Sequence, residues 1–333
     1  MSRIETNHLI IGNSTAAIAA VEGIRSLDSI ARITLLAAET EHTYSRPLIT
    51  YLLGGEVGED RMYYRPQDFY EKLDVHKHLG IEVVRVEPGK HFVRTSQGEM
   101  IHYEKLLIAT GGVPIIPDIP GNRCEGVFTF LRWQDAVNVR TFIEKRKATR
   151  AVIIGAGLIG MKTLEALLAL GIHVDVVELA EHALSAMLDE TAAQIIHDKL
   201  RDDGVQIHTQ KTVKNILSRY DTIQAVQLTD GTEISCDLLI LAIGVRPNIG
   251  FLEGSGIQTD RGVIVDDAMR TSHADIFAAG DVAQGHDILT GVKRPVAIFP
   301  SAFGQGKTAG LNMAGGSAEY KGSMAMNSVG FRG

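Results

Sequence analysis

The chain has 333 residues, of which 45% are hydrophobic and 22% charged, enough to bury a large core in two domains. Its net charge of −7 argues against nucleic-acid binding, because proteins of that class carry a basic footprint. No apolar run reaches the roughly 18 residues that a membrane span needs, and the first residues lack the apolar region of a signal peptide. The two cysteines, Cys124 and Cys236, have no metal-ligand spacing, so we expect no metal and a reducing, cytoplasmic setting.

The first elements in chain order predict a nucleotide-binding unit. An apolar strand at residues 8–11 is followed by a turn and a helix over "GNSTAAIAAVEGIRS", a second strand over "ARITLLAAE" and a closing strand over "YEKLLIATGG". Gly12, Ser14 and Ala17 occupy the glycine positions of a G-x-G-x-x-G pattern, and the last two are small enough to keep its geometry. Glu39, which ends the second strand, is the candidate for binding ribose hydroxyls. Read alone this degraded copy is a weak signal, and the second copy strengthens it.

A second unit repeats this order with the full glycine pattern. The stretch "RAVIIGAGLIGMKTLEALLALG" is followed by "IHVDVVELAE" and closed by "SCDLLILAIGVRPN". Gly155 allows a tight turn, Gly157 lets the backbone approach a pyrophosphate at the helix N-terminus, and Gly160 allows close helix–strand packing. Glu178 ends the next strand, where a carboxylate can bind both ribose hydroxyls. No arginine follows Glu178 to bind a 2′-phosphate, which favours NADH over NADPH.

The last motif, "IFAAGDVAQG", ends a strand with Gly280 followed by Asp281. A carboxylate there can accept a hydrogen bond from a ribityl hydroxyl, and a turn-capping aspartate is the alternative. A helix is predicted near residues 305–314, beginning around Ser301. Its N-terminal dipole favours a group that gains negative charge, such as a flavin C2 carbonyl.

Strands alternate with helices in both units. This order predicts an α/β fold with parallel sheets and with ligands at the carboxyl ends of the strands. Two such units predict two nucleotide sites. The final stretch, "MAMNSVGFRG", is typical of the start of a further strand.

In family order, "IIGNSTAA", "LLIATGGVP", "VIIGAGLIG…VVELAE", "LLILAIGVRPN" and "IFAAGDVA" resemble the motifs of the FAD-dependent pyridine nucleotide–disulfide oxidoreductase family. The resemblance implies two Rossmann-like FAD/NAD(P)-binding domains of three-layer ββα architecture. The FAD domain would comprise residues 1–118 and 245–324, and the NAD domain residues 119–244. The family's C-terminal interface domain would be missing, with residues 325–333 as its truncated start, and a full-length form would be able to form a homodimer.

The resemblance also implies which residues bind the two cofactors, FAD and NADH. Arg132 is the least specific of them, because an ordinary surface arginine fits the sequence almost as well. The FAD set is Gly12, Asn13, Ser14, Thr15, Ala16, Ala17, Glu39, Arg46, Pro47, Val83, Ala109, Thr110, Gly111, Arg132, Gly280, Asp281 and Phe299. The NAD set is Gly155, Gly157, Leu158, Ile159, Gly160, Glu178 and Gly244.

The run "TYSRPLITYLLGG" at residues 43–55 bears on how electrons leave the flavin. Thiol-using members of the family have a cysteine in the matching segment, and here Pro47 occupies that position. The run is instead similar to rubredoxin reductases, ferredoxin reductases of oxygenase systems and the flavin part of nitrite reductases, which have Arg/Lys-Pro and no redox cysteine. Cys124 and Cys236 are therefore expected to be inert, and electrons are expected to leave the flavin directly.

The implied function is an NADH-dependent FAD oxidoreductase. It would pass hydride from NADH to flavin and electrons on to rubredoxin, ferredoxin or an iron–sulfur or nitrite reductase partner, with no acid–base dyad or covalent nucleophile. An NADH oxidase that reduces dioxygen and a flavin-binding sensor with little turnover are the alternatives. Many relatives pair a glutamate of the NAD helix with a lysine of the 43–55 run, and here those positions are Lys162 and Tyr51. Lys162 either faces the flavin or is a plain helix-surface lysine.

Overall fold

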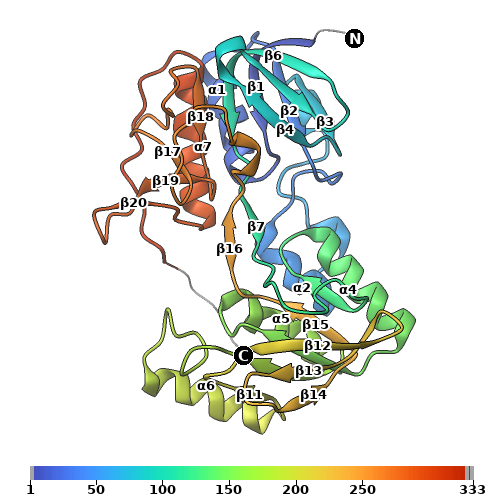
Figure 1. Ribbon diagram of the computed structural model, residues 1–333. Coiled ribbons are helices and arrows are strands. Elements are labelled where there is room, and N and C mark those ends of the chain that lie inside the picture. Colours follow the sequence, from blue (N-terminus) through green and yellow to red (C-terminus); the bar gives the residue numbers. More distant parts are fainter. Residues whose placement is uncertain (1–3, 327–329, 331–333) are drawn as a thin grey trace. The chain divides into compact units, whose positions relative to one another are not determined.

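The computed structural model describes residues 4–326 and residue 330, which form two units (Figure 1). The first unit comprises residues 4–44, 63–113 and 246–326, and the second comprises residues 45–62, 114–245 and 330. Each unit contains a parallel sheet with helices, which confirms the predicted α/β class. Within the described part of the chain, no helix has the length and apolar character required to cross a membrane.

The first unit is built on a seven-stranded sheet. β1 begins earlier than the predicted strand at residues 8–11, because Ile4, Glu5 and Thr6 also pair with residues 101–103. β1 pairs in parallel with both β2 and β6, so the first glycine turn starts from the middle of the sheet. In spatial order the strands are β3 (Val75–Leu79), β2 (Ile33–Ala37), β1 (Ile4–Ile11), β6 (Met100–Ile108), β5 (Phe92–Thr95) and β4 (Val83–Glu87), and β18 (Ile276–Ala278) also pairs with β6.

Two helices of the first unit, α1 (Thr15–Leu27) and α7 (Phe299–Met313), lie side by side (Figure 1). α7 is the helix predicted near residues 305–314. The two helices approach closely: a Cβ on Gly306 of α7 would lie 2.1 Å from Ala16 O of α1. β2 is buried along its whole length, as expected for a strand of a parallel sheet with both faces covered.

Shorter elements complete the first unit. A hairpin precedes the closing strand, since β4 and β5 pair antiparallel and lead into β6. α3 (Phe69–Lys72) precedes β3, and a small three-stranded sheet contains β17 (Val263–Ile264), β19 (Ala283–His286) and β20 (Lys293–Arg294). β7 (Gly112–Pro114) and β16 (Val245–Pro247) form a separate two-stranded sheet.

The second unit repeats the arrangement with five parallel strands. Its helices are α4 (Trp133–Arg146), α5 (Leu158–Ala169) and α6 (Glu190–Asp202). An antiparallel sheet of β12 (Val213–Arg219), β13 (Thr222–Leu228) and β14 (Glu233–Ser235) precedes the closing strand β15 (Leu238–Leu241). The parallel strands are, in spatial order, β11 (Gln206–His208), β10 (His173–Val177), β9 (Arg150–Ile154), β15 (Leu238–Leu241) and β8 (Val127–Thr129).

Residues 45–62 differ from the expected division of the chain. The family resemblance assigns them to the FAD domain, whereas in the structure they group with the second unit. The cause is α2 (Ile49–Gly54), which buries Ile49, Leu52 and Leu53 and packs against α4 and α5. The further strand expected within residues 325–333 falls largely outside the described residues.

Candidate functional site

The two glycine turns share one backbone geometry, each within its own unit. Gly12 follows β1 with a φ of 126°, and its N–H donates to Leu36 O at 2.8 Å. Gly155 follows β9 with a φ of 101°, and its N–H donates to Val177 O at 2.8 Å. Glycine adopts this backbone conformation without the penalty that a Cβ would bring. The turns therefore fix where α1 and α5 begin.

The backbone of each turn lies very close to the residue that follows the closing strand of its unit. A Cβ on Gly12 would lie 2.1 Å from Ala109 O, and one on Gly155 would lie 2.4 Å from Ala242 O. At Gly157, by contrast, no other part of the described chain lies within 4 Å of where a Cβ would stand, apart from its chain neighbours and its own helix. The backbone at the start of α5 is therefore open to a ligand, as diphosphate binding at a helix N-terminus requires.

A carboxylate follows each turn at the end of the next strand. Glu178 accepts a hydrogen bond from the Ala156 N–H at 2.6 Å and another from the Ala180 N–H at 2.8 Å, one on each carboxylate oxygen. These bonds fix the carboxylate beside the Gly155 turn and leave each oxygen with further acceptor capacity for ribose hydroxyls. In the first unit, Glu39 accepts a hydrogen bond from the Tyr44 hydroxyl at 2.5 Å.

Three motif segments of the first unit meet at one end of its sheet. They are residues 12–17, 109–111 and 280–281, which follow β1, β6 and β18, three strands that are neighbours in the sheet. The Gly280 N–H donates to Gln305 Oε1 at 2.8 Å, and Thr110 Oγ1 donates to Asn248 O at 3.0 Å. The fold thus gathers residues that are far apart in the sequence.

Val83 and Phe299 lie on other elements of the same unit. Val83 is buried at the start of β4. Gly80, which directly follows β3, donates its N–H to Glu39 O at 3.1 Å, and this bond extends the pairing of β3 with β2. Phe299 is the first residue of α7, and its ring contacts Tyr64 edge-on with 5.0 Å between the ring centroids.

Two buried threonine hydroxyls allow a test of whether the first unit fits a dinucleotide. Thr15 is the first residue of α1, and Thr43 lies in the segment after Glu39. Oγ1 of each is buried and has no hydrogen-bond partner among residues 4–326 and 330. Because buried polar groups are nearly always paired, unpaired hydroxyls flanking the glycine turn fit a polar ligand such as FAD.

Arg46, Pro47 and Arg132 lie in the second unit. Arg46 and Pro47 begin the short helix η1 (Arg46–Leu48), and the Arg46 guanidinium donates to Leu131 O at 3.2 Å. Arg132 is the next residue and is the N-cap of α4, where its N–H donates to the Asp135 carboxylate at 2.9 Å. The fold therefore brings Arg46 to the segment that carries Arg132.

Lys162 and Tyr51, which correspond to a family ion pair, do meet in the second unit. The Lys162 ammonium lies 5.0 Å from the centroid of the Tyr51 ring, a cation–π distance. It also forms an ion pair with Glu165 one turn further along α5. Burial opposes the charge, but the hydrogen bond and the charge of Glu165 raise the pKa of Lys162, so it stays a cation. A glutamate–lysine pair is replaced here by a lysine held over an aromatic ring.

The two cysteines lie in one buried cluster of the second unit. Burial, helped by the nearby charge of Asp237, raises the pKa of Cys236 to about 12. Burial also raises the pKa of Cys124. Because the thiolate is the reactive form, neither side chain is set up as a nucleophile or redox thiol. The described residues contain no cluster of His, Cys, Asp and Glu suited to a metal ion.

Three side chains that support these sites carry no sequence motif. Tyr44 holds the Glu39 carboxylate, and Gln305 holds the Gly280 N–H. Tyr70, on α3, donates its hydroxyl to Asn13 Oδ1 at 2.5 Å. The sequence gives no signal for these roles, because the fold brings each side chain to a partner that is remote in the chain or on another element.

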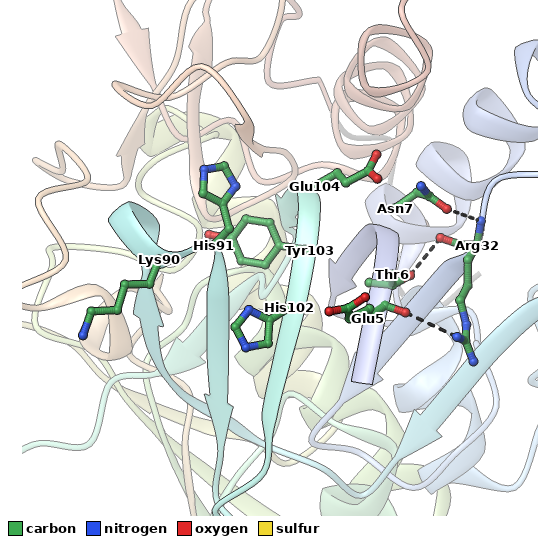
Figure 2. Close-up of a pocket in the computed structure, with 9 residues that line it drawn as sticks. All are labelled: Glu5, Thr6, Asn7, Arg32, Lys90, His91, His102, Tyr103 and Glu104. Atoms are coloured by element: carbon green, nitrogen blue, oxygen red, sulfur yellow. Dashed lines mark hydrogen bonds between the residues drawn. The ribbon is translucent and has the colours of Figure 1, made fainter. Parts of the chain in front are cut away.

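A separate pocket of about 380 Å³ lies at the other end of the first unit's sheet (Figure 2). Its residues come from the amino-terminal part of β1, from the first part of β6 and from the residues around Lys90. The glycine turn follows the carboxyl end of β1, so this pocket is not part of the candidate FAD site. It is lined by Glu5, Thr6, Asn7, Arg32, Lys90, His91, His102, Tyr103 and Glu104.

Residues 6–306 match the family described as pyridine nucleotide-disulphide oxidoreductase. The chain is 34% identical to the NADH-dependent phenylglyoxylate dehydrogenase subunit epsilon of Aromatoleum evansii, over 98% of this chain and 77% of that subunit. It is 31% identical to the NAD(P)H nitrite reductase of Bacillus subtilis, over 86% of this chain but only 36% of the reductase.

Among solved structures, the chain is similar to a ferredoxin reductase from Rhodopseudomonas palustris. The two share 25% identity with a TM-score of 0.88, over 95% of this chain and 78% of the reductase. The similarity covers both units, so it extends the agreement beyond the glycine motifs.

Proposed function

Because the chain belongs to the pyridine nucleotide-disulphide oxidoreductase family, whose members bind FAD and NAD(H), we propose that it is an NADH-dependent flavin oxidoreductase that uses no thiol. Its electrons go to a redox protein such as ferredoxin or rubredoxin, or to an iron–sulfur or nitrite reductase partner. We assign residues 1–118 and 245–324 to the FAD domain. Residues 119–244 hold NADH.

In the first unit, the residues around the glycine turn bind the adenosine diphosphate part of FAD. The backbone N–H groups at the start of α1 receive the diphosphate, and Glu39 accepts hydrogen bonds from ribose hydroxyls. Asp281 accepts a hydrogen bond from the ribityl chain, and the N-terminus of α7 stabilises negative charge. When bound, FAD supplies the redox chemistry, and the protein supplies orientation and electrostatics.

In the second unit, the open backbone at Gly157 receives the diphosphate of NADH. Glu178, fixed by two backbone N–H groups, binds the adenine ribose diol and repels a 2′-phosphate. Lys162 is held over Tyr51 as a cation, and we assign it to the electrostatics of the nicotinamide end.

The burial of both cysteines is the main observation in favour of electron transfer without a thiol. Both thiols lie in the core of the second unit, and burial raises the pKa of each, so neither exchanges electrons as a thiolate. The relatives support a protein acceptor: one is a subunit of an NADH-dependent dehydrogenase, one a nitrite reductase and one a ferredoxin reductase.

Anaerobic reduction followed by mixing with acceptors tests the proposal. The protein with bound FAD is reduced with NADH. It is then mixed separately with ferredoxin, with rubredoxin and with air-saturated buffer, while flavin absorbance is recorded. We expect faster reoxidation by a protein acceptor than by dioxygen, and the same rates in the Cys124→Ser/Cys236→Ser variant. Reoxidation by dioxygen alone would indicate an NADH oxidase. A long-wavelength charge-transfer band that the double serine change abolishes would show that a thiol takes part.

A further inference from the structure

One tyrosine hydroxyl joins two segments of the first unit that the FAD motifs leave unconnected. Tyr70 is 1% exposed on α3, and its hydroxyl donates to Asn13 Oδ1 at 2.5 Å and accepts from the Thr43 N–H at 3.2 Å. The Asn13 side chain also donates to Glu41 O at 3.1 Å. The Asn13 amide therefore ties the glycine turn to residues 41–43, and Tyr70 fixes that amide.

The environment of Tyr70 keeps its hydroxyl in place and protonated. The ring packs edge-on against His42, with 4.8 Å between the centroids, and the Lys77 ammonium lies 4.6 Å from the ring centroid. Burial raises the pKa of Tyr70 to about 12, so the hydroxyl remains a donor at neutral pH. The hydroxyl is thus held by a buried ring and stays protonated.

Two unpaired hydroxyls flank this anchor. Thr43, whose N–H is bound by Tyr70, is fully buried, and its Oγ1 has no partner within the described part of the chain. Thr15 Oγ1, two residues after Asn13 in the glycine turn, is likewise buried and unpaired there. Since a buried hydroxyl normally has a partner, both sides of the anchor point to a polar ligand.

We propose that Tyr70 is a positioning residue for the adenosine diphosphate half of FAD. Its hydroxyl holds the glycine turn and the segment after Glu39 in the geometry that binds the nucleotide, without touching it. This inference rests on the proposed function, because it requires FAD in the first unit. Holding a site in its bound geometry increases affinity by lowering the ordering cost of binding.

The test compares Tyr70→Phe with Tyr103→Phe in the full chain. Tyr103 is a matched control in the same unit: it is also buried, its ring lies 5.7 Å from that of His91, and its hydroxyl has no partner among the described residues (Figure 2). Dissociation constants are measured for FAD and for ADP with the FAD-free protein, together with the urea midpoint of unfolding. The KM for NADH is measured with FAD saturating.

We expect Tyr70→Phe to raise the dissociation constants for FAD and for ADP by the same factor, roughly fivefold or more. The loss of one net hydrogen bond predicts a change of this size. The KM for NADH should not change, and Tyr103→Phe should bind both nucleotides like the unmodified protein. Asn13→Ala removes the same bond and also the Asn13–Glu41 bond, so its loss of affinity should be at least as large. The double variant should lose less affinity than the two single losses multiplied together, since both changes remove the Tyr70–Asn13 bond.

Wild-type affinity for ADP in a folded Tyr70→Phe variant would overturn the inference while leaving FAD binding in place. Equal losses in the Tyr70 and Tyr103 variants would also overturn it, because they would reflect packing and not the hydroxyl. Should Tyr70→Phe fail to fold, wild-type affinity for ADP in a folded Asn13→Ala variant overturns the inference, because that change also removes the Tyr70–Asn13 bond. A wild-type protein that binds no FAD would instead reject the proposed function.

Discussion

Glu178 is the side chain that should separate the two nicotinamide coenzymes. Its carboxylate is fixed by the N–H groups of Ala156 and Ala180, so it cannot turn away from a 2′-phosphate. We expect Glu178→Ala to raise the KM for NADH about tenfold, because hydrogen bonds to a charged group are lost. The difference between the KM values for NADH and NADPH should therefore become smaller. Steady-state kinetics with both coenzymes measures this. Glu181→Ala, an exposed change in the same loop, is the control, and equal use of NADPH by the unmodified protein would contradict the assignment.

His8 should make the first unit sensitive to acid. It is buried in β1, its Nδ1 has no partner among the described residues, and burial lowers its pKa to about 4. Between pH 6.5 and 4, His8 is therefore protonated in the unfolded chain but stays neutral in the folded chain. Stability that is fully present above pH 6.5 should fall by up to about 3 kcal/mol as the pH drops to 4.

Urea unfolding at pH 7 and pH 5 checks the role of His8. His8→Leu should reduce the difference between the two midpoints, whereas His76→Leu, an exposed change on β3 of the same sheet, should leave it unchanged. An unaltered difference in His8→Leu would assign the acid sensitivity to other groups.

At the scale of elements, the contact between α1 and α7 should control the first glycine turn. A Cβ on Gly306 would lie 2.1 Å from Ala16 O, a backbone atom, so Gly306→Ala must push the two helices apart. Overpacking of this kind costs typically 1–3 kcal/mol. Because α1 starts directly from the turn, the variant should also release FAD more readily. Gly89→Ala is the control, since its Cβ would stand in open space; FAD retention equal in both variants would count against the coupling.

The elements that the sequence predicted are those whose signals are local. The glycine turns, the strands before them and the carboxylates after them lie within one β–α–β stretch each, so spacing along the chain is enough to find them. The placement of α2 was not accessible in this way, because its apolar face is satisfied by α4 and α5, which are remote in sequence. The same holds for Tyr70, whose partners Asn13 and Thr43 reach it only through the fold.

At the scale of the whole molecule, the Gly12 turn should be needed for FAD binding and the Gly155 turn for NADH binding. Gly12→Ala would place a Cβ 2.1 Å from Ala109 O, so this variant should be purified without FAD. Gly155→Ala would place one 2.4 Å from Ala242 O in the other unit. It should stay yellow and be reduced normally by dithionite, but need roughly tenfold or more NADH, given the strain of a positive φ. Absorbance spectra and NADH titrations of the two variants measure this, and each variant is the control for the other. Loss of FAD from both would reject independent sites.

The burial of both cysteines has a consequence for how the protein meets oxidants and alkylating reagents. Enzymes that relay electrons through a reactive thiolate can be inactivated by peroxide, which carries sulfur up its oxidation series, or by iodoacetamide. Here each sulfur lies in the core of the second unit, and burial keeps it protonated. If electrons pass from the flavin to the acceptor without a thiol, as proposed, peroxide has no thiol step to block. The protein would then keep passing electrons to its acceptor under oxidative stress and would need no reducing agent during purification.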